Sequence, residues 1–97
     1  MALVRVREVD VIGKRVLRVV FSDGLVRELD FAPCTAGVFR ALLDDATFNA
    51  VAVDGVAGTI GFPGGIDFDP DVLHGDAESA AVQQPVLVRQ YGLERSG

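Results

Sequence analysis

The chain has 97 residues, which allows one domain built around a single modest core. Hydrophobic residues make up 49% and charged residues 24%, and this balance predicts a folded chain. A single cysteine excludes an internal disulfide and a cysteine-based zinc site, and a single histidine excludes a site that needs several histidines. The formal net charge of −5 argues against a general nucleic-acid binder, because such proteins need a basic surface.

The acidic residues gather in the middle of the chain. Residues 41–80 contain eight Asp or Glu residues and no Lys or Arg. A segment with this charge attracts a basic partner, and it is also typical of a solvated acidic face. No apolar run is long enough to span a bilayer, and the N-terminus lacks the apolar stretch of a signal peptide, so we expect a cytoplasmic protein.

The first third of the chain predicts a three-stranded antiparallel meander. Apolar and polar residues alternate over residues 4–12, with a slip near Glu8 that indicates a bulge. The alternation returns over residues 15–21 and 25–31, and Asp23-Gly24 between them predicts a two-residue turn in which both residues have positive φ. The residues expected to face the core are Leu17, Val19, Phe21, Leu29 and Phe31.

The middle of the chain predicts a short helix packed on the meander. Pro33 ends the sheet, and Thr35 is the expected N-cap of a helix that reaches about Leu43. Phe48 is expected to be a further core anchor. The helical positions expected to contact the meander are Val38, Phe39, Leu42 and Leu43.

A β-hairpin and a second short helix follow. Residues 50–53 and 57–62 predict two strands joined by a turn at Asp54-Gly55. Asp69-Pro70 predicts a helix start, because Asp can cap the free N–H groups and Pro fits the first helical position. We expect this C-terminal helix to end near Gly75.

The overall prediction is an α+β fold with one domain over residues 1–76 and a C-terminal tail over residues 77–97. Residues 77–85 form a polar connector, and Val86-Leu87-Val88 is an extra strand, a partner-binding segment or part of a frayed tail. The mean hydropathy of +0.34 is high for a small monomer. It indicates apolar surface buried against a second copy or another partner.

Four acidic residues are candidate metal ligands, namely Asp67, Asp69, Asp71 and Glu78. Their spacing matches the first, third, fifth and twelfth places of a calcium loop, although Val72 stands where that loop needs glycine. The alternative interpretation is helix capping by Asp69, with Asp71 favoured in the first helical turn.

The sequence offers no complete set of catalytic residues. Cys34 needs a basic partner to act as a nucleophile, and His74 is the one histidine available. A buried apolar role for Cys34 and a surface position for His74 are the simpler interpretations. Several arginines on one face of the meander suggest either a nucleic-acid surface or cross-strand ion pairs, and we favour ion pairs. They are Arg5, Arg7, Arg15, Arg18 and Arg27.

Two pieces of sequence carry a family resemblance. They are Phe21-Ser22-Asp23-Gly24 and the pattern Pro-x-Gly-Ile-Asp-x-x-Pro-Asp-x-Leu over residues 63–73. Together they resemble the bacterial domain-of-unknown-function family 2442, over about Val4 to Asp76. Phe62 replaces the family's usual Trp, and the tail has no counterpart. The resemblance implies a small α+β fold, no established catalytic activity, and a toxin–antitoxin-like pairing with another small protein.

These observations favour a non-enzymatic protein-binding or regulatory module of the antitoxin-like kind. The alternatives are a structural homodimer subunit and a small acidic metal-binding protein. We expect no catalytic residue and no cofactor. The expected partner is a second copy of the chain or a small protein, and neither a membrane nor direct contact with nucleic acid is expected.

Overall fold

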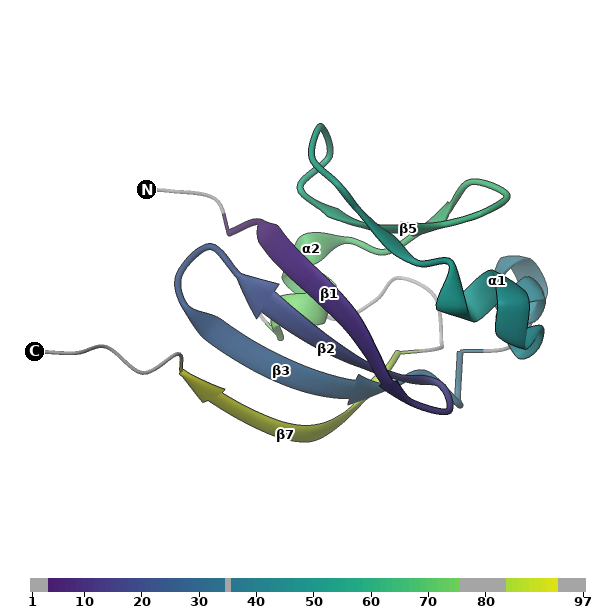
Figure 1. Cartoon of the computed structure of the whole chain (residues 1–97), viewed down its shortest axis with the longest axis horizontal. Coiled ribbons are helices and arrows are strands. Elements are labelled where there is room, and N and C mark those ends of the chain that lie inside the picture. Colours follow the sequence, from purple (N-terminus) through teal and green to yellow (C-terminus); the bar gives the residue numbers. More distant parts are fainter. Residues whose placement is uncertain (1–3, 35, 76–83, 93–97) are drawn as a thin grey trace, which may run out of the picture.

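The computed structural model describes residues 4–34, 36–75 and 84–92, and it confirms the α+β fold (Figure 1). One antiparallel sheet has the strand order β1-β2-β3-β7, and a smaller antiparallel sheet has the order β4-β5-β6. Short helices connect and cover them. The elements are β1 (Val6–Gly13), β2 (Val16–Phe21), β3 (Leu25–Asp30), the 3-10 helix η1 (Gly37–Leu43), α1 (Asp45–Asn49), β4 (Ala52–Asp54), β5 (Thr59–Phe62), β6 (Ile66–Asp67), α2 (Pro70–His74) and β7 (Val86–Gly92).

The predicted meander is confirmed, together with the bulge in its first strand. The pairing of β1 with β2 shifts register between Val6 and Glu8, so Arg7 is the extra residue. A bulge reverses the alternation of side chains between the two faces of a sheet. It therefore explains why the apolar residues of β1 change phase at this point in the sequence.

The turn between β2 and β3 is one residue longer than predicted. The strands end at Phe21 and resume at Leu25, and the Gly24 N–H donates to the Phe21 carbonyl over 3.0 Å. Gly24 has the expected positive φ of 91°, but Asp23 does not share it. This is a three-residue loop with glycine in the left-handed position. The Asp23 side chain instead accepts a hydrogen bond from the Leu25 N–H.

The hydrophobic core lies between the meander on one side and the helices and small sheet on the other. All five meander residues predicted to face it are buried. Leu42 and Phe48 join them as predicted, and Phe39 is partly buried against the same cluster. Leu43 contradicts the prediction, because it is 55% exposed on a 3-10 helix whose turns differ from the expected α-helix. The N-cap of η1 is Ala36, whereas the predicted cap, Thr35, lies outside the described residues.

The sequence did not predict helix α1. Asp44 caps it by accepting hydrogen bonds from the backbone N–H of Thr47 over 3.0 Å and from the Thr47 hydroxyl over 2.8 Å. An Asp followed three residues later by Thr is a short helix-start signal. The helix buries Phe48, which was predicted as a core residue but without a helix around it.

The C-terminal helix forms where the sequence placed it, and the second hairpin forms with a longer turn than the predicted Asp54-Gly55, because Asp54 ends β4 and β5 begins only at Thr59. The loop between β4 and β5 runs from Gly55 to Gly58 and is held by the Asp54 carboxylate, which accepts from the N–H groups of Val56 and Ala57. Asp69 caps α2 by accepting from the Asp71 N–H over 2.9 Å. Gly75 ends α2 with φ at 97°, as a C-terminal glycine does.

The tail segment Val86-Leu87-Val88 is part of a strand. Strand β7 pairs antiparallel with β3, with Val26 opposite Tyr91 and Glu28 opposite Arg89. Most of the predicted polar connector falls in residues 76–83, which lie outside the described residues. Among the helices that the structure describes, none is long and apolar enough to cross a membrane.

The backbone at Gly24 generates a stability prediction. A Cβ added there meets no atom within 4 Å, so the cost of Gly24→Ala comes from the positive φ alone. We expect it to lower the free energy of unfolding by about 1–2 kcal/mol, measured by urea denaturation. Gly55→Ala is the matched control, because Gly55 also has free space around it but no positive φ. Equal stabilities for the two variants would contradict the turn assignment.

Candidate functional site

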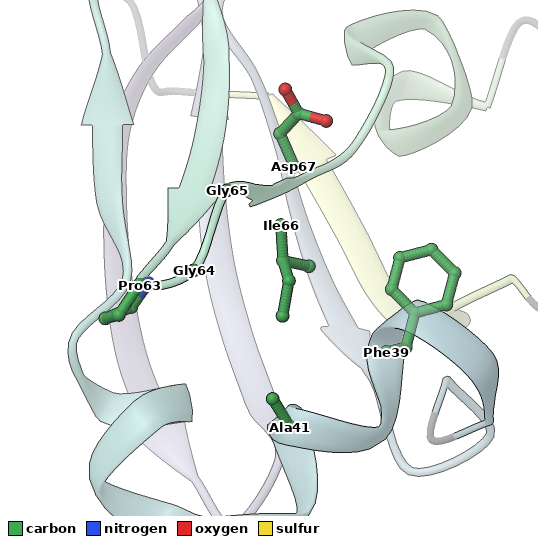
Figure 2. A pocket seen from close by; sticks show the side chains of 7 residues that line it. All are labelled: Phe39, Ala41, Pro63, Gly64, Gly65, Ile66 and Asp67. Carbon is green, nitrogen blue, oxygen red and sulfur yellow. The ribbon is translucent and has the colours of Figure 1, made fainter.

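A surface hollow lies between η1 and the loop that joins β5 to β6 (Figure 2). Its volume is about 470 Å³. The loop is Pro63-Gly64-Gly65, in which Gly64 and Gly65 have φ values of 94° and 79°. Two consecutive residues in this conformation favour glycine and let the chain reverse tightly. The residues that line the hollow are Phe39, Ala41, Pro63, Gly64, Gly65, Ile66 and Asp67.

The wall of the hollow belongs to the hydrophobic core. The Phe39 ring stacks on Phe68, with centroids 4.8 Å apart and planes 10° from parallel. Phe68 in turn meets Phe31 edge-on at 5.1 Å. The Thr59 hydroxyl donates to the Phe68 carbonyl, which fixes the chain directly after β6. The hollow is therefore supported from beneath by packed rings and is not a gap between loose loops.

The two residues of β6 face opposite ways. Figure 2 shows Ile66 pointing toward Ala41 of η1, while the Asp67 carboxylate points to the other side of the strand. Ile66 is buried and Asp67 is exposed. The residues that line the hollow are mostly apolar, and Asp67 is the one charged residue among them.

The structure separates the predicted metal ligands by role. Asp69 is the cap of α2 and Asp71 lies in its first turn, while Asp67 is exposed on β6. Glu78 lies outside the described residues. Within the described ranges, no group of three or more His, Cys, Asp or Glu side chains is placed to hold a metal ion.

The two residues considered for nucleophilic chemistry, Cys34 and His74, are both packed inside the fold. Cys34 is fully buried, and this burial, with a smaller effect of Asp30, raises the pKa of its thiol to about 11. His74 was predicted to lie on the surface, but its side chain is only 14% exposed. Its Nε2 lies 2.8 Å from Asp23 Oδ2, and its ring meets Phe21 edge-on at 4.9 Å. The Leu25 N–H and His74 together lower the pKa of Asp23.

The arginines do not form one basic face. Arg5 donates to the Gly55 carbonyl over 2.6 Å, and Arg27 donates to the Leu73 carbonyl over 2.6 Å on the core side of the sheet. Arg18 forms a cross-strand ion pair with Asp10 at 3.3 Å, which confirms the ion-pair interpretation there. The guanidinium groups mainly tie elements together.

Arg15 joins the meander to the helices, a role that was not predicted from the sequence. It occupies the β1–β2 turn with φ at 62° and is only 8% exposed. Its guanidinium binds Asp45 at 2.5 Å, donates to the Leu43 carbonyl, and lies 5.7 Å from the Phe48 ring centroid. Arg15 lowers the pKa of the Asp45 carboxyl through this hydrogen bond and its charge.

A polar cluster covers the outer face of the sheet, where β7 joins β3. Glu28 accepts from Arg89 at 3.1 and 3.0 Å and from the Tyr91 hydroxyl at 3.4 Å. Arg18 donates to the same hydroxyl at 3.4 Å. Val26 lies opposite Tyr91 and is fully buried, so the tail strand shields apolar surface on this face.

Comparison with known proteins places the sequence in a family. Residues 6–78 match the family model described as a protein of unknown function (DUF2442). The chain belongs to this family. The match includes the DUF2442 loop Pro63-Gly64-Gly65 and ends before β7. No curated protein matches the sequence, and no solved structure matches it. The chain is thus a small α+β member of DUF2442, an uncharacterised family.

The Arg15–Asp45 contact generates a pH prediction. Because the folded-state pKa of Asp45 is below its ordinary 3.8, the contact stabilises the protein above that pH and is lost as pH falls through the folded-state value. We expect Asp45→Asn to be less stable than the native chain at pH 7. The difference in the free energy of unfolding between the two proteins should shrink as pH falls below about 3.8 and disappear below the folded-state pKa of Asp45.

The measurement is urea denaturation at a series of pH values. Asp67→Asn is the control, because Asp67 is an exposed carboxylate far along the chain from Arg15. A gap for Asp45→Asn that stays constant down to the lowest pH would contradict the ion pair.

The burial of Cys34 generates a reactivity prediction. The thiolate is the reactive form, so a buried thiol with a raised pKa reacts slowly. We expect an aromatic disulfide reagent at mildly alkaline pH to label Cys34 in urea but not in the folded protein. Val56→Cys supplies the positive control, since position 56 is 94% exposed. Fast labelling of native Cys34 would show that the core opens locally.

Proposed function

We propose that the protein is a non-enzymatic protein-binding module that receives an apolar side chain of a partner protein in the hollow between η1 and the Pro63-Gly64-Gly65 loop. The observation that carries the proposal is the apolar lining of this hollow on a rigid support. Its volume lies within the roughly 300–1,000 Å³ usual for binding sites.

The charge around the hollow supports a basic partner. Asp67 lines the hollow and the exposed Asp44 directly follows η1, and residues 41–75 contain no Lys or Arg, although the exposed Arg40 lies on η1 itself. An acidic surface speeds the approach of a positively charged protein and adds little affinity by itself. We therefore infer a small partner with an apolar anchor residue and basic residues near it.

The residues considered for catalysis support binding over chemistry. Cys34 is inside the core, and His74 is held by Asp23 and Phe21. The toxin–antitoxin-like pairing with another small protein that the family resemblance implies fits a regulatory module of this kind. The partner would then be the other member of the pair.

Filling the hollow tests the proposal. Ala41 lines it from η1 and is exposed, so Ala41→Trp should block the site without disturbing the core. Ala57→Trp is the matched control, because Ala57 is exposed on the loop between β4 and β5, at the other end of β5. Affinity capture from the source organism should recover a basic protein with the native chain and with Ala57→Trp, and at least tenfold less with Ala41→Trp.

Equal folding of the three proteins is checked by circular dichroism before capture. Recovery of the same protein by Ala41→Trp at the native level would contradict the proposal. So would the failure of every variant to recover a basic protein.

A second candidate function is a homodimer subunit. It is favoured by the exposed aliphatic residues Val86, Leu87 and Val88 of β7, none of which lines the hollow.

A further inference from the structure

Among the strands that the structure describes, β7 is an edge of the larger sheet with no further strand paired to it. It is the last strand in the order β1-β2-β3-β7, and Figure 1 shows it at the margin of the molecule, away from β5 and α1. The opposite edge is partly covered, because the Val6 N–H of β1 donates to the Gly58 carbonyl over 2.9 Å. The backbone groups on the outer side of β7 are therefore available for pairing with another strand.

The open edge is apolar to an unusual degree. Val86, Leu87 and Val88 are 54%, 42% and 55% exposed. Natural edge strands are usually protected by lysine, proline or inward-pointing charges. Here the one charged residue of β7 is Arg89, and Glu28 draws it onto the outer face of the sheet. The register of β7 against β3 shifts between Glu28 and Leu29, which indicates a bulge at Val88, but all three aliphatic residues remain about half exposed.

We propose that β7 pairs antiparallel with β7 of a second copy of this chain, which joins two four-stranded sheets into one continuous sheet. A strand that pairs with itself in this way obeys two-fold symmetry, so the contact closes as a dimer and does not extend into a fibre. The order Val-Leu-Val reads the same in both directions. With the two-fold axis at Leu87, each Val86 faces a Val88 of the other copy and the two Leu87 side chains meet, so the two β7 strands overlap over Val86–Val88 and Arg89 lies opposite Pro85.

Charge favours the same contact. Each copy carries a net charge of −5, so two copies repel unless they meet where acidic groups are few. Residues 84–92 contain no Asp or Glu and carry only Arg89. The β7 edge is thus a part of this acidic molecule that a second copy can approach without opposing carboxylates.

The contact belongs to the weak class of interfaces. The three residues of β7 that overlap about this axis on each side, Val86–Val88, bury less than the roughly 1,200 Å² of a standard stable interface. We therefore expect a concentration-dependent dimer with a dissociation constant of about 10–100 µM.

Sedimentation equilibrium of the full chain tests the proposal. The native chain should shift from 10.3 kDa toward twice that mass across this concentration range. Val88→Lys should stay monomeric at all concentrations, because it places a charged side chain among the aliphatic residues of the contact, opposite Val86 of the other copy. Val56→Lys is the matched control, a lysine at an exposed valine on the loop between β4 and β5, and should dimerise like the native chain.

Cross-linking provides a second measurement if Val88→Lys folds poorly. Oxidised glutathione should convert Leu87→Cys into a disulfide-linked dimer, while Val56→Cys should mostly form the glutathione adduct, and the buried Cys34 should not react. Ala41→Trp should dimerise normally, which separates this proposal from the hollow. A monomeric native chain at about 500 µM, or equal cross-linking of the two cysteine variants, would overturn it.

Discussion

Five phenylalanine rings hold the two sheets and the short helices in one core. Phe31 after β3 contacts both Phe48 of α1 and Phe68 after β6, and Phe62 of β5 contacts the same two rings. Phe39 of η1 completes the set by stacking on Phe68. Helices of five to seven residues are too short to be stable alone, so their positions depend on such anchors. Aromatic pairs add about 0.5–1.5 kcal/mol each beyond the burial of their surface.

The parts of the fold that could be predicted from the sequence are those with a local pattern, whereas the contacts among the rings join residues far apart in the chain. The meander follows from a local period of two, so Leu17, Val19 and Phe21 could be assigned to the core directly. The caps at Asp69 and Gly75 are equally local. The turn at Gly24 was predicted one residue too short, because Asp-Gly is typical of a two-residue turn, whereas here Ser22 also belongs to the loop. Helix α1 was missed because a single turn has no usable periodicity.

The candidate site was less predictable because its parts are distant in the chain. The hollow needs Ala41 of η1 to lie opposite Ile66 of β6, and only the packed aromatic core brings them together. The motif around Pro63-Gly64-Gly65 could be picked out, but its partner across the hollow could not. Arg15 was assigned to a group of surface arginines. A charged residue in a turn gives no local indication that a carbonyl and a carboxylate from a later helix will enclose it.

The tail strand extends the family fold. The match to DUF2442 ends at residue 78, and β7 begins at Val86. By pairing with β3, β7 moves the open edge of the sheet outward by one strand, and it places Tyr91 over Val26. The family core and the tail thus present different surfaces, with the hollow on the former and the aliphatic edge on the latter.

Position 15 has a consequence for how this sequence can change over evolutionary time. A left-handed backbone favours glycine by about 1 kcal/mol or more, yet glycine would lose the charge-assisted hydrogen bond to the Leu43 carbonyl, which is typically larger at about 1.5–3 kcal/mol. Lysine would keep the charge but lack the planar group that reaches two acceptors at once. Replacement of Arg15 in a descendant is therefore expected to follow, not precede, a change in the helix pair that it holds.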